Sequence, residues 1–155
     1  MVGVCGPIVL GSWRAKADLA GVAAFRRACR IAGDAHPHIG ILGTAEETAP
    51  PPDGLSRQAI ADMLRAEAGR LVGVAYLIEG TGFRAAVLRG ITIGLTSLSG
   101  EGVSQKVLPT TMGAAEWLVG QLVRAGVRDV PPALLVASEM DRLRGTPPER
   151  VSFVG

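Results

Sequence analysis

The chain of 155 residues is poor in aromatic side chains (4%) and in charge (19%), whereas 48% of its residues are hydrophobic. A buried core is therefore available, and global disorder is excluded. The formal net charge of +2 argues against nucleic acid as an obligate partner, because phosphate binding usually needs a concentrated basic face. Arg, Glu or Gly interrupts every apolar run well before the roughly 20 residues that cross a bilayer, so no membrane span is expected.

Groups that bind metals or react as nucleophiles are scarce. Cys5 and Cys29 are expected to be buried structural thiols, since neither lies at an obvious helix start. No secretory leader is visible, which favours a reducing, cytoplasmic compartment. His36 and His38 flank Pro37, and two histidines alone make a poor zinc site. We therefore expect no metal and no other cofactor.

A basic cluster stands out against this low charge. Arg26, Arg27 and Arg30 fall on one predicted helix. A solvated helix face explains them, and a surface for an anionic partner is the alternative.

Strand and helix signals alternate along the chain, most clearly over residues 71–119. A strand–helix–strand unit nearly obliges a parallel sheet that is covered by helices. Upstream, residues 2–13 read as two short strands broken by Gly6-Pro7, and a helix capped by Asp18 and ended by Gly33 follows. The predicted fold class is α/β, with a mixed, largely parallel sheet of four to five strands covered by helices.

Two later helices carry features that bear on function. Ser56 is the predicted N-cap of the helix that follows the three prolines at 50–52. Thr81 is the predicted N-cap of the next helix, which is apolar almost all round. Such a helix must be covered on more than one side, by the C-terminal residues or by a second chain. Its apolar residues are Phe83, Val87, Leu88, Ile91, Ile93, Leu95 and Leu98.

The chain divides into two parts. Residues 1–126 are expected to form the α/β domain. Residues 127–155 form a C-terminal extension, with a helix after Pro131-Pro132 and a short strand over 151–154. The apolar side of this extension predicts that it packs on the domain or on a neighbouring chain.

Two segments carry a family likeness: YLIEGTGFRAAVLRGITIGL at 76–95 and KVLPTTMGAAEWL at 106–118. With the element order, they resemble the STAS domain superfamily, the fold of bacterial anti-sigma-factor antagonists. The likeness is to its SpoIIAA-like branch, which is related to the CRAL-TRIO lipid carriers, and it covers about residues 7–124.

This resemblance implies a non-enzymatic regulatory or scaffold domain that acts through protein–protein contacts. The partner is another protein or a second copy of the chain, as a homodimer or a higher oligomer. The family's regulatory phosphosite falls on Ser56, which a simple helix cap also explains. The candidate partner-contact residues are Asp53, Arg57, Arg84 and Arg89.

Two other functions remain open. The related carriers imply binding of a lipid or a small apolar ligand, and a set of small residues offers either internal space for it or tight packing. These residues are Gly73, Ala75, Ala85, Ala86, Gly90 and Gly94. An enzyme would have to use Glu46, Glu47 and Glu79 at the carboxyl ends of strands, as solvated acids or as an acid–base pair. Since no nucleophile or oxyanion donor accompanies them, catalysis is not expected.

Overall fold

The computed structural model describes residues 1–97 and 102–145, without the side chains of 83, 84 and 96. Five strands and five helices alternate along this part of the chain. Their order is β1 (Val2–Cys5), β2 (Ile8–Trp13), α1 (Leu19–Ala35), β3 (Ile39–Ala45), α2 (Gly54–Glu67), β4 (Leu71–Ile78), α3 (Phe83–Ser97), β5 (Ser104–Leu108), α4 (Thr111–Arg124) and α5 (Ala133–Gly145).

The five strands form one mixed sheet in the order β1-β2-β3-β4-β5. β1 pairs antiparallel with β2 through a tight hairpin at Gly6, whose φ of 55° suits a residue without a side chain. The other three pairings are parallel. The predicted α/β class with a largely parallel sheet is confirmed.

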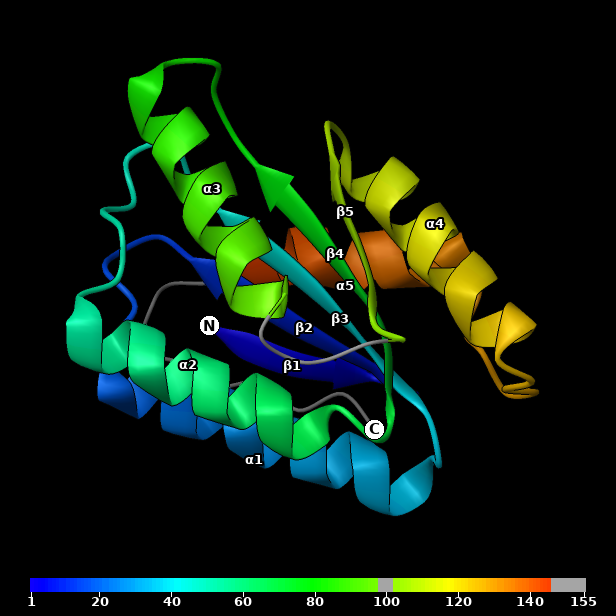
Figure 1. Ribbon diagram of the computed structural model, residues 1–155. Coiled ribbons are helices and arrows are strands. Elements are labelled where there is room, and N and C mark those ends of the chain that lie inside the picture. Colours follow the sequence, from blue (N-terminus) through cyan, green and yellow to red (C-terminus); the bar gives the residue numbers. More distant parts are fainter. Residues whose placement is uncertain (98–101, 146–155) are drawn as a thin grey trace.

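The strand order determines which helices cover which face. β2 to β5 lie side by side in chain order, so every crossover moves the same way across the sheet. Because parallel crossovers are right-handed, α1, α2 and α3 fall on one face. α4 and α5 follow the last strand and cover the opposite face (Figure 1).

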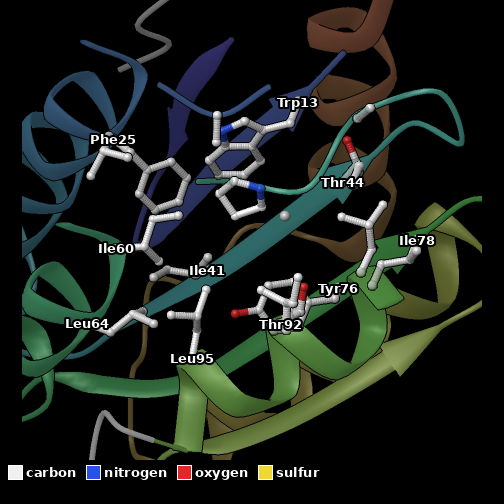
Figure 2. A pocket seen from close by; sticks show the side chains of 18 of the residues that line it. Trp13, Phe25, Ile41, Thr44, Ile60, Leu64, Tyr76, Ile78, Thr92 and Leu95 are labelled. Carbon is white, nitrogen blue, oxygen red and sulfur yellow. The ribbon is translucent and has the colours of Figure 1, made fainter. Parts of the chain in front are cut away.

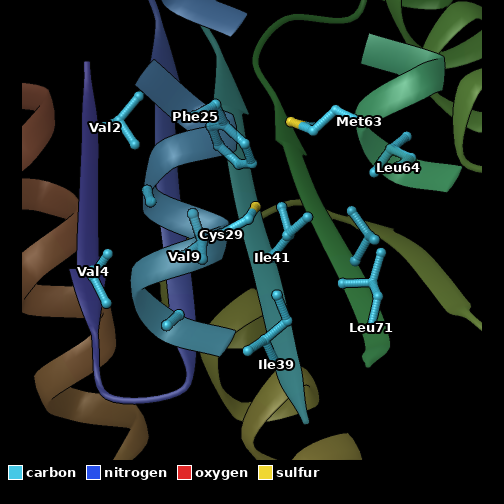
Figure 3. Packing of buried hydrophobic residues seen from close by; sticks show 13 residues of the cluster. Val2, Val4, Val9, Phe25, Cys29, Ile39, Ile41, Met63, Leu64 and Leu71 are labelled. Carbon is cyan, nitrogen blue, oxygen red and sulfur yellow. The ribbon is translucent and has the colours of Figure 1, made fainter. Parts of the chain in front are cut away.

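Each face has its own core. On one side, Phe25 and Cys29 of α1 pack over the sheet residues Val9 and Ile41, together with Leu64 of α2 (Figure 3). On the other, Leu118 and Leu122 of α4 lie in one buried cluster with residues of the sheet and of α5. α5 contributes Val136, Ala137, Met140 and Leu143 to this cluster. The helix beyond residue 126 therefore packs on its own domain.

Three helix ends differ from the sequence prediction. α1 runs through Gly33 to Ala35. Asp53 caps α2, since its carboxylate accepts a hydrogen bond from the backbone N–H of Ser56 at 2.8 Å. The prediction that Ser56 is the cap is therefore wrong. α3 begins at Phe83, two residues after the predicted cap Thr81, because the carbonyl of Gly82 accepts its first helical hydrogen bond.

The apolar third helix has one face toward the sheet and one toward solvent. Ala85 and Leu88 are buried, whereas Ile93 is 46% exposed. Leu98 and the strand predicted over 151–154 lie outside the described residues, so the predicted cover of α3 by the C-terminal residues is not tested.

Candidate functional site

An apolar cavity of about 110 Å³ lies between the sheet and helices α1, α2 and α3. The last residues of β2, β3 and β4 (Trp13, Ala45 and Ile78) all line it, which places it at the carboxyl edge of the parallel strands (Figure 2). Open α/β sheets bind their ligands at this edge. The presence of a cavity and its place at this edge both indicate a candidate binding site.

Aromatic rings form one wall of the cavity. The rings of Trp13 and Phe25 lie 5.3 Å apart between centroids and are tilted by 32°. Gly11 lies beneath them, and a Cβ atom there would come within 2.7 Å of Cζ3 of Trp13. A glycine at this position is therefore needed for the two rings to close over β2.

The opposite wall comes from β4 and α3. Tyr76 of β4 lines the cavity with Thr92 and Leu95 of α3, across from the two aromatic rings (Figure 2). Gly43 on β3 forms part of the floor between these walls. No Asp, Glu, Lys, Arg or His lines the cavity among the residues that the structure describes. Such a space favours hydrocarbon over water.

A second cavity, of about 580 Å³, lies next to the first. Apolar side chains line much of it, and we call it the polar cavity because charged and hydroxyl side chains also line it. Ile78 lines both, and the second is further lined by Glu79, Arg89, Arg144 and hydroxyls at the start of α4. Arg144 forms an ion pair with Glu79. Arg89 donates a hydrogen bond from Nη2 to the carbonyl oxygen of Gly80 at 2.7 Å.

The three glutamates considered for catalysis are separated by their partners. Glu46 pairs with Arg14 at 2.9 Å, and Glu79 pairs with Arg144. Glu47 packs instead against Gly80, where an added Cβ atom would lie 2.8 Å from Cδ of Glu47. Two of the three carboxylates are thus held in ion pairs with different arginines rather than beside each other.

Ser56, the predicted phosphosite, is buried, with 2% of its surface exposed. A regulatory phosphosite needs an exposed hydroxyl, but Ser56 lies inside the first turn of α2. A kinase reaches this hydroxyl only if that turn opens. The serine hydroxyl at the position that the resemblance indicates is therefore not accessible to a kinase in the folded protein.

Asp53 is exposed at the same helix start. Its carboxylate pairs with the ammonium of Lys16 at 2.7 Å. Hydrogen bonds from Lys16, and then from Ser56, hold the pKa of Asp53 well below its usual value of 3.8. Asp53 therefore links the segment before α1 to the start of α2.

The other predicted contact residues do not form one surface. Arg57 is exposed on α2, whereas Arg89 is half-buried on α3 in the wall of the polar cavity. Arg84 belongs to α3, but its side chain lies outside the described residues. Only Asp53 and Arg57 are brought together, since the N–H of Arg57 donates to the carbonyl of Asp53.

The remaining predictions concern thiols, metals and membranes. Both cysteines are free and buried, as predicted, and burial together with the nearby Glu67 raises the pKa of Cys29 to about 12. Among the described residues, no group of three His, Cys, Asp or Glu side chains could hold a metal ion. In the same part of the chain no helix has the length and apolar character to cross a membrane. Arg26, Arg27 and Arg30 are exposed on α1.

Sequence reasoning missed the residues that build the apolar site. Trp13, Gly43 and Tyr76 come from three different strands, and nothing in their local spacing joins them. Their common signal is position at the carboxyl edge of the sheet, which becomes readable once the strands are aligned. Comparison with protein-family models, with curated proteins and with solved structures yields no match to this chain.

Proposed function

We propose that this protein is a non-enzymatic carrier or sensor of a small apolar ligand, bound in the cavity between the sheet and α1, α2 and α3. The apolar cavity at the carboxyl edge of the sheet is the observation that carries this proposal. The STAS-like resemblance supports it through the related lipid carriers. Two buried free thiols suit a reducing, cytoplasmic location.

Cavity size and chemistry indicate the kind of ligand. A dry cavity of about 150 Å³ lined by Leu, Ile and Phe binds benzene in another protein. The present cavity, at about 110 Å³, suits a short acyl chain or a single small ring rather than a long lipid tail. Transfer of each methylene group from water contributes about 0.8 kcal/mol.

Trp13 supplies a reporter for this binding. The chain has two tryptophans, and Trp117 lies on α4, on the opposite face of the sheet. In a Trp117→Phe background, titration with 1-octanol should change the fluorescence of Trp13 with a saturable dependence on concentration. A linear, non-saturating response up to the solubility limit of octanol would contradict the proposal.

A protein-contact module is the second candidate. Leu55 is 73% exposed as the second residue of α2, and Leu19 is 55% exposed as the first residue of α1. The Lys16–Asp53 ion pair joins the two segments that precede these leucines. Exposed leucines at adjoining helix starts suit a contact with a second copy of the chain or with another protein.

Native mass spectrometry at micromolar concentration tests the self-association form of this candidate. A dimer that Leu55→Asp converts to monomer would support it, with Arg26→Asp on the exposed face of α1 as the control. A monomer at every concentration would exclude self-association through this surface.

A further inference from the structure

We infer that the ligand is an anionic amphiphile, with its hydrocarbon part in the apolar cavity and its negatively charged head beside Arg89 in the polar cavity. This inference rests on the proposed function, and it adds the charge and orientation of the ligand. Its chemical class is an aliphatic carboxylate with a short or medium chain.

The two cavities share one lining residue at a strand end and draw on successive residues of one helix. Ile78, the last residue of β4, lines both. On α3, Leu88 lines the apolar cavity, and the next residue, Arg89, lines the polar one. Consecutive helical residues point about 100° apart, so α3 presents a hydrocarbon surface and a guanidinium group to neighbouring spaces. A molecule with an apolar end and a charged end matches this arrangement.

Among the described charges that line the polar cavity, Arg89 is the cation without an ionic partner. Arg144 is paired with Glu79, so those two charges compensate each other. Among the described residues no carboxylate pairs with Arg89, whose hydrogen bond goes to the neutral carbonyl of Gly80. A guanidinium has five N–H donors in a fixed fork, so most remain available to a carboxylate.

Glu47 is the competing charge at this position. A Cβ atom on Gly80 would lie 2.8 Å from Cδ of Glu47, so the Glu47 carboxylate lies against the residue whose carbonyl holds Arg89. It forms no ion pair with Arg89 in the described part of the chain. A bound carboxylate would face this negative charge, so removal of the charge should favour the anionic ligand.

Three ligands of equal chain length test the inference at neutral pH: octanoate, 1-octanol and octylamine. Calorimetric titration of the wild-type protein should give affinities in that order, with octanoate about tenfold tighter than octanol, the size expected for a hydrogen bond to a charged group. Arg89→Gln should abolish this preference. Arg89→Lys should restore part of it, and Glu47→Gln should increase it. Arg124→Gln, an exposed residue on α4, is the matched control.

The outcomes separate the inference from the proposed function. If octanoate and octanol bind equally, the apolar site stands and the anionic head is excluded. If the preference persists in a folded Arg89→Gln variant, the assignment to Arg89 is overturned. If none of the three ligands binds, the proposed function itself fails.

Discussion

Tyr76 covers Gly43 across the floor of the apolar cavity: a Cβ atom on Gly43 would lie 3.4 Å from Cδ1 of the tyrosine ring. This is an ordinary van der Waals distance, so alanine fits and fills part of the cavity. The Gly43→Ala variant should weaken octanol binding about fourfold, the equivalent of one methylene group, without loss of stability.

Two other glycines provide the controls for Gly43→Ala. Gly120→Ala in α4 adds a methyl group far from the cavity and should leave binding unchanged. Gly11→Ala forces a clash with Phe25 and Trp13 and should lower the free energy of unfolding by about 1–3 kcal/mol. Equal octanol affinities in the wild-type protein and Gly43→Ala would place the ligand elsewhere.

Gly33 is a further glycine whose replacement should change stability. A Cβ atom there would lie 2.7 Å from Cζ of Arg70, whose guanidinium crosses α1 at this point. Arg70 pairs at 2.6 Å with Glu67, whose side chain is 4% exposed. Gly33→Ala should displace the arginine and leave a buried carboxylate poorly paired, which costs about 2 kcal/mol of stability in chemical denaturation.

Gly90 on α3 is the matched control for Gly33. A Cβ atom on Gly90 meets nothing within 4 Å. Gly90→Ala should therefore raise stability by about 0.5–1 kcal/mol through helix propensity. Glycine-to-alanine substitution should thus lower stability at Gly33 in α1 and raise it at Gly90 in α3. A stabilising Gly33→Ala would contradict the role given to Arg70.

The Asp53 cap should make stability depend on pH in acid. Its pKa in the folded protein is depressed below 3.8, so its contribution is complete above that value and is lost as the pH falls toward the folded pKa. Thermal unfolding should show a midpoint a few degrees lower for Asp53→Ala at neutral pH, and this difference should shrink below pH 3.8. A constant difference between the two proteins from neutral to acid pH would rule out this linkage.

Cys29 should make the stability of the protein depend on pH in alkali. Burial raises its pKa from 9.0 to about 12, so the unfolded chain loses this proton first as the pH rises. Stability should decline above about pH 9, and less steeply in Cys29→Ala. At neutral pH a thiol reagent should modify Cys29 only as fast as the protein unfolds, and rapid modification of the native protein would disprove its burial.

The fold could be predicted from the sequence because local signals and sheet topology agree. Apolar runs bounded by turn residues mark β3 and β4, and the Gly6-Pro7 pair marks the hairpin of β1 and β2. Helix ends were less predictable where tertiary contacts override local preference. Gly33 resembles a helix terminator, yet it lies within α1, where the guanidinium of Arg70 occupies the space that a side chain would fill.

The candidate site was predictable only in outline. The small residues of β4 and α3 left internal space and tight packing both open, and a Cβ atom on Gly90 or Gly94 would meet no neighbour within 4 Å. The cavity depends on how Trp13, Gly43 and Tyr76 face one another across three strands, and spacing along one strand does not report this. Ser56 shows the same limit, because its burial depends on Asp53 taking the capping position.

Methyl NMR during a titration with 1-octanol tests the central claim most directly. We expect saturable shift changes in methyl groups that line the apolar cavity, such as those of Ile41, Ile60 and Leu88. Methyl groups of Leu42 and Leu118, packed on the opposite face of the sheet, should stay unchanged. Unchanged cavity methyl groups up to the solubility limit, or changes confined to exposed leucines such as Leu134, would contradict the claim that this cavity is a binding site.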